Sequence, residues 1–191
     1  YKTGGGKTHI VRTIGVIEKG IVLIFIPLLT LSADVLTKFI DSNKNYGTIT
    51  VQHLDELREN NFSKYQKFLQ TCEDMQRSTT STIFVFLSPQ FLVNHDDARQ
   101  VFIRASHRRT VRVIVMDEIH LQVQHGESFR EECRELADVF FKEIFQHLNY
   151  PNIGIRFLGT TATLSGYYSY IKLILSCIAK LFISNTVHIL L

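Results

Sequence analysis

Residues 3–8 of the 191-residue chain read Thr3-Gly4-Gly5-Gly6-Lys7-Thr8. Consecutive glycines let the backbone adopt positive φ angles and turn its N–H groups toward an anion. A helix that begins near Lys7 would add the positive end of its dipole. The Lys7 ammonium would neutralise phosphate oxygens, and the Thr8 hydroxyl would bind Mg²⁺. This run therefore predicts a loop that holds nucleotide phosphates; the competing interpretation is a flexible glycine-rich terminus.

A second motif lies farther along the chain, where the apolar run 111–116 ends in Asp117-Glu118-Ile119-His120. Asp117 would contact Mg²⁺ directly or through water, and Glu118 would orient and deprotonate the attacking water. A solvated acidic pair at a strand end is the alternative. His120 would serve in coupling, unless it is an ordinary core or surface histidine. Together the two motifs predict a nucleoside triphosphatase that uses Mg²⁺.

Around these motifs, short apolar or β-branched runs alternate with segments of helical periodicity. Strands are predicted at residues 21–26, 47–53, 82–87, 111–116, 153–158 and 187–191. Helices are predicted at residues 9–18, 30–40, 54–76 (as one helix or two), 95–107, 129–148 and 164–182. Uniformly apolar strands indicate burial on both faces. The alternation of strands and helices predicts a three-layer α/β domain with a mainly parallel sheet.

Several candidate residues follow predicted strands. In a parallel sheet, ligands collect at the carboxyl ends of the strands. The glycine loop, Pro27, Pro89, Asp117 and Thr161 lie just after predicted strands, or where one would have been, so we expect them to converge on one edge. A phosphate loop normally joins a strand to a helix. Because no strand precedes residues 3–8, the expectation is a fragment that is truncated at its N-terminus.

The composition narrows the class of protein only a little. Apolar residues make up 45% of the chain, enough for one domain with a sizeable core. The net charge of +3 permits a nucleic-acid surface without requiring one. Three widely spaced cysteines indicate reduced thiols of an intracellular protein. No apolar stretch is long and uninterrupted enough for a membrane helix, so we expect no membrane partner.

The motifs resemble those of a known family. Residues 3–8, 117–120 and 161–163 (Thr-Ala-Thr) are similar to motifs I, II and III of superfamily-two helicases. Within that group the chain looks most like the RecQ-like branch. Residues 27–34 resemble its motif Ia, residues 88–92 its motif Ib, and residues 121–130 its aromatic-rich loop.

This resemblance implies a three-layer RecA-like P-loop domain over residues 1–191, without the second RecA-like domain, so we expect this chain alone to be inactive, with weak ATP binding and little or no unwinding. It also implies a 3′→5′ ATP-dependent DNA helicase that acts on single-stranded or forked DNA in the nucleus, or in the cytoplasm of a prokaryote. Residues 3–8 would hold ATP, Thr8 and Asp117 would hold Mg²⁺, and Glu118, Asp117 and Lys7 would be catalytic. The residues implied for nucleic-acid contact and coupling are Pro27, Ser88, Pro89, His120, Gln124, His125, Phe129, Arg130, Thr161 and Thr163.

The chain also departs from the RecQ-like pattern. His125 stands where a Trp is usual, Glu127-Ser128 where a His-Asp pair is usual, and Ile119 where an Ala is usual. Loss of an aromatic platform weakens base stacking. A second interpretation is therefore a degenerate helicase-derived module that binds nucleic acid or a protein without turnover. A third is a different P-loop ATPase, such as a translocase that acts on RNA.

Overall fold

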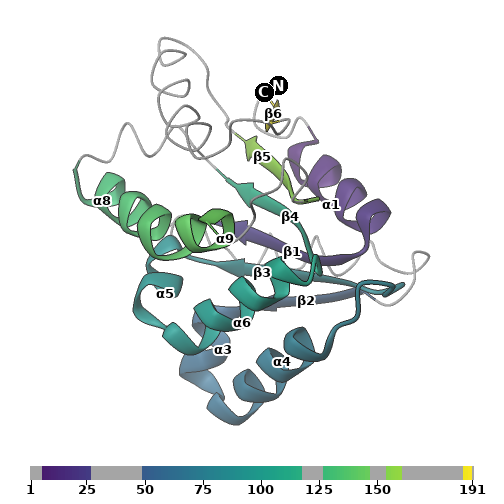
Figure 1. Cartoon of the computed structure of the whole chain (residues 1–191), viewed down its shortest axis with the longest axis horizontal. Helices are drawn as coiled ribbons and strands as arrows, with labels where there is room; N and C mark the ends of the chain where they lie inside the picture. Colours follow the sequence, from purple (N-terminus) through teal and green to yellow (C-terminus); the bar gives the residue numbers. More distant parts are fainter. Residues whose placement is uncertain (1–5, 27–48, 118–126, 147–153, 161–186, 191) are drawn as a thin grey trace.

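The computed structural model describes residues 6–26, 49–117, 127–146, 154–160 and 187–190 (Figure 1). Within these residues the chain forms a six-stranded sheet in the order β2-β3-β1-β4-β5-β6, and every neighbouring pair is parallel. The predicted α/β class with a mainly parallel sheet is therefore confirmed. The strands are β1 (Gly20–Phe25), β2 (Ile49–His53), β3 (Thr82–Leu87), β4 (Val111–Met116), β5 (Arg156–Thr160) and β6 (Val187–Leu190).

Most predicted strands agree with the observed ones to within two residues. The exception is the run at 153–158, because β5 begins and ends later, at Arg156 and Thr160. Gly154 has a φ of 70°, which is incompatible with an extended strand, and the pairing with β4 starts only at Arg156 opposite Val113. This shift brings Thr160 to the carboxyl end of the strand.

The described helices connect and cover the strands. They are α1 (Lys7–Glu18), α3 (Leu54–Asn60), α4 (Phe62–Asp74), α5 (Pro89–Asn94), α6 (Asp96–His107), α8 (Glu127–Leu136), the π-helical turn η2 (Ala137–Phe141) and α9 (Lys142–Gln146). The predicted helix at 54–76 is two helices, because the Asn61 side chain caps α4 by accepting a hydrogen bond from the Lys64 N–H. The predicted helices at 30–40 and 164–182 lie outside the described residues.

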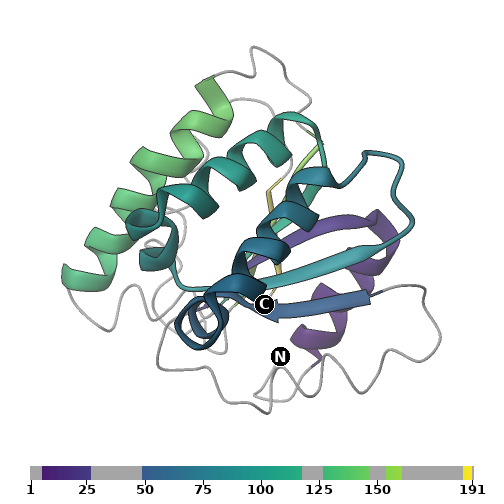
Figure 2. The ribbon, with the colours of Figure 1, turned by 90° about the horizontal axis from the view of Figure 1, so that it is seen from below.

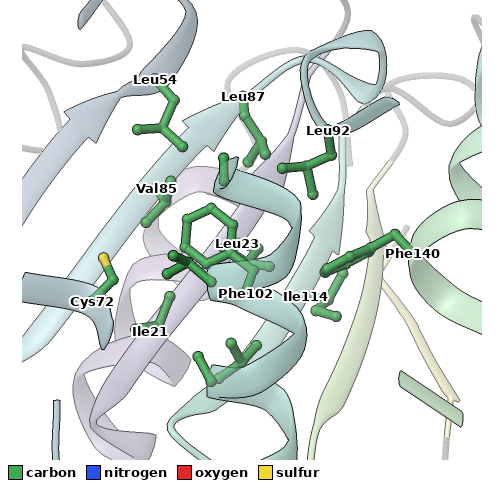
Figure 3. Packing of buried hydrophobic residues seen from close by; sticks show 14 of the residues in the cluster. Ile21, Leu23, Leu54, Cys72, Val85, Leu87, Leu92, Phe102, Ile114 and Phe140 are labelled. Atoms are coloured by element: carbon green, nitrogen blue, oxygen red, sulfur yellow. The ribbon is translucent and has the colours of Figure 1, made fainter. Parts of the chain in front are cut away.

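Helices cover both faces of the sheet. In Figures 1 and 2, α1 lies on one face, while α3, α4, α5, α6, α8 and α9 lie on the other. Alternate residues of β1 and of β3 belong to two separate apolar clusters. On the larger side, Leu23, Val85 and Ile114 pack beneath Phe102 of α6 and Phe140 of η2 (Figure 3). Burial on both sides explains why β1 and β3 are apolar at every position except Gly20 and Thr82.

Gly15 allows α1 to approach the sheet closely. Glycine inside a helix costs about 0.5–1 kcal/mol relative to alanine. Here a Cβ atom at position 15 would lie 2.6 Å from Cε1 of Phe84 and 2.9 Å from Cγ2 of Val22. The missing side chain therefore sets the distance between α1 and the sheet, and with it the position of the loop at the start of α1.

Candidate nucleotide-binding site

The first turn of α1 has the features of an anion site. Gly6 is its N-cap residue, with φ 84° and ψ 7°, so a glycine does occupy the left-handed region that the loop requires. Among the described residues no side chain caps this turn, and no acidic residue lies in it. The first N–H groups of a helix lack intrahelical partners and carry partial positive charge. They are thus available to an anion, and Thr8 is exposed beside them.

The start of α1 lies at the same edge of the sheet as the carboxyl ends of the strands. Only Lys19, with a φ of 56°, separates α1 from β1, so the helix runs back along the strand. The 12 residues of α1 rise about 18 Å. The six residues of β1 rise about 20 Å, so α1 begins level with the end of β1.

Asp117 lies at this same edge, directly after β4. Its backbone N–H donates a hydrogen bond of 2.9 Å to the Phe25 carbonyl at the end of β1. Its half-buried carboxylate accepts a hydrogen bond from the Thr160 hydroxyl at the end of β5. The two bonds connect the carboxyl ends of three neighbouring strands. Asp117 is therefore held in a fixed position at the edge predicted to bind nucleotide.

Thr160 is a residue that the sequence analysis missed. Its side chain is buried, and its hydroxyl is committed to Asp117. The available signal was a polar residue that ends an apolar strand immediately before Thr161-Ala162-Thr163. The hydrogen bond joins the second helicase-like motif to the segment that carries the third.

Ser88 and Pro89 lie at the carboxyl end of β3. The Ser88 hydroxyl donates a 2.7 Å hydrogen bond to the Asp55 carboxylate and accepts one from the Phe91 N–H, which makes Ser88 the N-cap of α5. Pro89 is buried at the first helical position. In this arrangement the hydroxyl makes its hydrogen bonds inside the protein, and the contact of this segment with nucleic acid stays a prediction.

A buried histidine joins this cluster at the end of β2. His53 is 4% exposed, and its Nδ1 atom accepts a 3.2 Å hydrogen bond from the Glu56 N–H at the start of α3. Its Nε2 atom is 3.7 Å from Asp55 Oδ2. Burial lowers the pKa of His53, and the carboxylates of Asp55, Glu56 and Glu59 oppose this shift. The sequence analysis did not single out His53 or Asp55, because nothing local shows that Asp55 contacts Ser88.

The remaining predicted site residues are placed only in part. The backbones of Lys7 in α1 and of Phe129 and Arg130 in α8 are described, while the positions of their side chains are not. The predicted residues that lie outside the described residues are Thr3, Gly4, Gly5, Pro27, Glu118, His120, Gln124, His125, Thr161 and Thr163. Of the predicted set, the described residues bring Gly6, Thr8, Ser88, Pro89 and Asp117 to the carboxyl edge of the sheet.

The oxygen donors at this edge suit magnesium. Mg²⁺ prefers oxygen ligands, keeps several waters, and is usually held by one or two carboxylates together with substrate phosphates. A hydroxyl from Thr8 and a carboxylate from Asp117 meet this requirement. In the described part of the chain, no group of three or more His, Cys, Asp or Glu residues could hold a metal ion by itself.

An all-parallel α/β sheet with a glycine-capped helix and an aspartate at one edge is consistent with a RecA-like domain. Residues 1–169 match the DEAD/DEAH box helicase family, and the chain belongs to that family. The family consists of ATP-dependent nucleic-acid helicases that use Mg²⁺. No curated protein and no solved structure matches the chain. None of the described helices has the length and apolar character to cross a membrane.

Proposed function

We propose that this chain is the ATP-binding half of a RecQ-like DNA helicase, which couples ATP hydrolysis to 3′→5′ movement along a single strand. The observation that carries the proposal is the position of Asp117. Its carboxylate is held by Thr160 at the same edge of the sheet where α1 begins. We infer DNA as the substrate, and 3′→5′ as the direction of movement, from the RecQ-like motifs of the sequence.

In this proposal each residue has a defined task. The loop at residues 3–8 binds the triphosphate through its backbone N–H groups, and the Lys7 ammonium neutralises the terminal phosphates. Thr8 and Asp117 hold Mg²⁺, which supplies positive charge against the phosphate oxygens when bound. Glu118 accepts a proton from the attacking water. Thr160 orients the Asp117 carboxylate through its hydroxyl.

The same contact offers a route for coupling. Asp117 and Thr160 lie at the ends of adjacent strands, and Thr160 directly precedes residues 161–163, the segment similar to motif III. A change in the ligands of Asp117 would therefore alter its hydrogen bond to Thr160 and, through Thr160, the position of that segment. Residues 121–130, 27–34 and 88–92 would contact the DNA strand, and unwinding would need a second RecA-like domain.

A titration with a fluorescent ATP analogue tests the nucleotide site. Lys7→Ala is expected to weaken binding by at least about tenfold, because it removes a charge-assisted contact worth roughly 1.5–3 kcal/mol. Lys64→Ala, which removes an exposed lysine from α4, serves as the matched control and should bind as the wild type does. Equal affinity of Lys7→Ala and wild type would refute the phosphate loop.

A turnover assay separates the helicase from the non-catalytic module. Phosphate release is measured on a protein in which this chain is joined to a second RecA-like domain, with single-stranded DNA, with single-stranded RNA and with neither. Stimulation by DNA supports the proposal. Stimulation by RNA alone favours the RNA translocase, and DNA binding without any turnover favours the module, which the departures at His125 and Glu127-Ser128 would then explain.

A further inference from the structure

The edge of the sheet opposite the proposed nucleotide site is rich in positive charge. Since all strands are parallel, their amino ends meet at this edge. Basic residues precede or begin four neighbouring strands, β3, β1, β4 and β5. We name this set the amino-end basic surface: Lys19, Arg77, Arg108, Arg109, Arg112 and Arg156. Because neighbouring strands lie about 4.8 Å apart, four of them place these residues across roughly 15 Å.

Carboxylates neutralise only part of this surface. Glu73 at the end of α4 is shared by Arg104 and Arg108, at 2.8 Å and 2.6 Å. Glu18 pairs with Arg156 at 2.6 Å. Among the described residues, Lys19, Arg77, Arg109 and Arg112 have no acidic partner within ion-pair distance. Asp74 also lies at this edge, so in the described part of the chain three carboxylates stand against seven cations, namely the six of this surface and Arg104, and the edge carries a net positive charge.

The surface is partly exposed, and the turn that carries Arg109 is fixed. An open hollow of about 530 Å³ lies between the end of α4 and the start of β4, with Arg77 and Arg108 as well as Glu73 and Asp74 in its lining. Arg77 is exposed, and the Arg108 side chain is 40% exposed. The turn that carries Arg109, at φ 61°, is held because Thr110 donates two 2.9 Å hydrogen bonds to the Ala105 carbonyl. The guanidinium groups are thus presented from a rigid base.

We propose that the amino-end basic surface binds the phosphodiester backbone of a nucleic acid, at a contact separate from the strand-binding motifs at the carboxyl edge. Arginine forks match the geometry of phosphate oxygens, and several of them on one surface match a polymer with repeated charges. This proposal goes beyond the proposed function, since it requires neither ATP binding nor hydrolysis. An acidic protein segment is the competing occupant.

The test measures the salt dependence of oligonucleotide binding by fluorescence anisotropy, between about 50 and about 200 mM KCl. The double variant Arg77→Gln/Arg109→Gln removes two charges without removing an ion pair. The slope of log K against log salt should become shallower by roughly 1.5, since each phosphate contact contributes about 0.7–0.9. Affinity at the lower salt concentration should fall at least several-fold for single-stranded and duplex DNA alike.

Two further variants make the result decisive. Arg77→Glu reverses one exposed charge and leaves the turn at Arg109 intact, so the same loss should appear without any risk to folding. Lys64→Gln/Lys142→Gln removes the same charge from exposed positions elsewhere and should keep the wild-type slope. An equal loss in this control, or an unchanged slope in both test variants, would overturn the proposal.

A competition experiment decides between the two occupants. Poly-L-glutamate that binds the wild type and not Arg77→Glu, while oligonucleotide affinity stays equal in the two proteins, would assign the surface to an acidic protein segment. ATP-analogue affinity should be the same in Arg77→Gln/Arg109→Gln and in wild type. Conversely, Lys7→Ala should retain the salt slope, so the failure of either site can be recognised independently of the other.

Discussion

At the scale of single residues, a few side chains determine the geometry of the site. Asp117 is held by a backbone hydrogen bond to Phe25 and by a side-chain hydrogen bond from Thr160. Gly6 has the positive φ angle that is needed where α1 begins. Glycine and the acidic residue could be predicted from the sequence, because each has a characteristic local pattern. Thr160 could not, since its role depends on a contact between residues 43 positions apart.

Removal of the Thr160 hydroxyl should weaken both stability and the site. Thr160→Val leaves the Asp117 carboxylate without one of its hydrogen bonds, so the free energy of unfolding should fall by about 1–3 kcal/mol. Urea unfolding checks this value. Thr160→Ser keeps the hydroxyl and should stay close to wild type. A Val variant as stable as the Ser variant would show that the bond contributes nothing.

His53 should make the protein sensitive to mild acid. Because burial lowers its pKa in the folded state, the unfolded chain binds the proton more tightly than the native protein does. Its contribution is therefore fully present above the unfolded pKa of about 6.5, and stability is lost as the pH falls below that value.

The check is the free energy of unfolding at about pH 7.5 and about pH 5.5, on either side of the ordinary histidine pKa. His53→Asn keeps a good N-cap for α3 and removes the titrating group. The wild type should lose more stability across this interval than His53→Asn does. Identical losses would show that another group, such as His95, whose pKa is also lowered chiefly by burial, is responsible.

At the scale of elements, the sequence predicted the strands and helices that show an apolar run or a clear periodicity. It did not predict the elements whose ends depend on a single capping residue. The strands at 82–87 and 111–116 were predicted because both of their faces are covered, so every position except Thr82 and Arg112 is apolar. Helix α5 was missed because Ser88-Pro89 reads as the end of a strand, although a Ser N-cap followed by Pro also starts a helix. The break at Asn61 depends on one cap.

Helix α1 should tolerate no side chain at its point of contact with the sheet. Gly15→Val would force a displacement against Phe84 and Val22, and overpacking of this kind typically costs about 1–3 kcal/mol. Thermal unfolding should show a lowered midpoint, and affinity for the ATP analogue should fall because the start of α1 moves.

The matched control is Thr13→Ala on the exposed side of the same helix. Alanine favours helix more than threonine by a few tenths of a kcal/mol, so this variant should be equal to or slightly more stable than wild type. If Gly15→Val behaves like the control, the close approach of α1 does not position the site.

At the scale of the whole molecule, the parallel sheet separates two edges with different chemistry. The carboxyl edge gathers Gly6, Thr8 and Asp117, and the opposite edge gathers the amino-end basic surface. The α/β class and the common edge followed from the sequence, because parallel strands carry their carboxyl ends together. The order of the strands could not be predicted from the sequence, because the pairing of β6 with β5 is a long-range contact that leaves no local pattern.

The central claim is that Thr8 of α1 and Asp117 bind the same Mg²⁺ ion of one nucleotide. A double-mutant cycle of Thr8→Ala and Asp117→Asn, measured as Mg²⁺-dependent affinity for an ATP analogue, tests it most directly. Asn retains an acceptor for Thr160, so the fold is preserved. If both residues hold the same ion, we expect a coupling energy of about 0.5–3 kcal/mol between them. Strictly additive losses, or Asp117→Asn binding Mg²⁺-nucleotide as tightly as wild type, would contradict it.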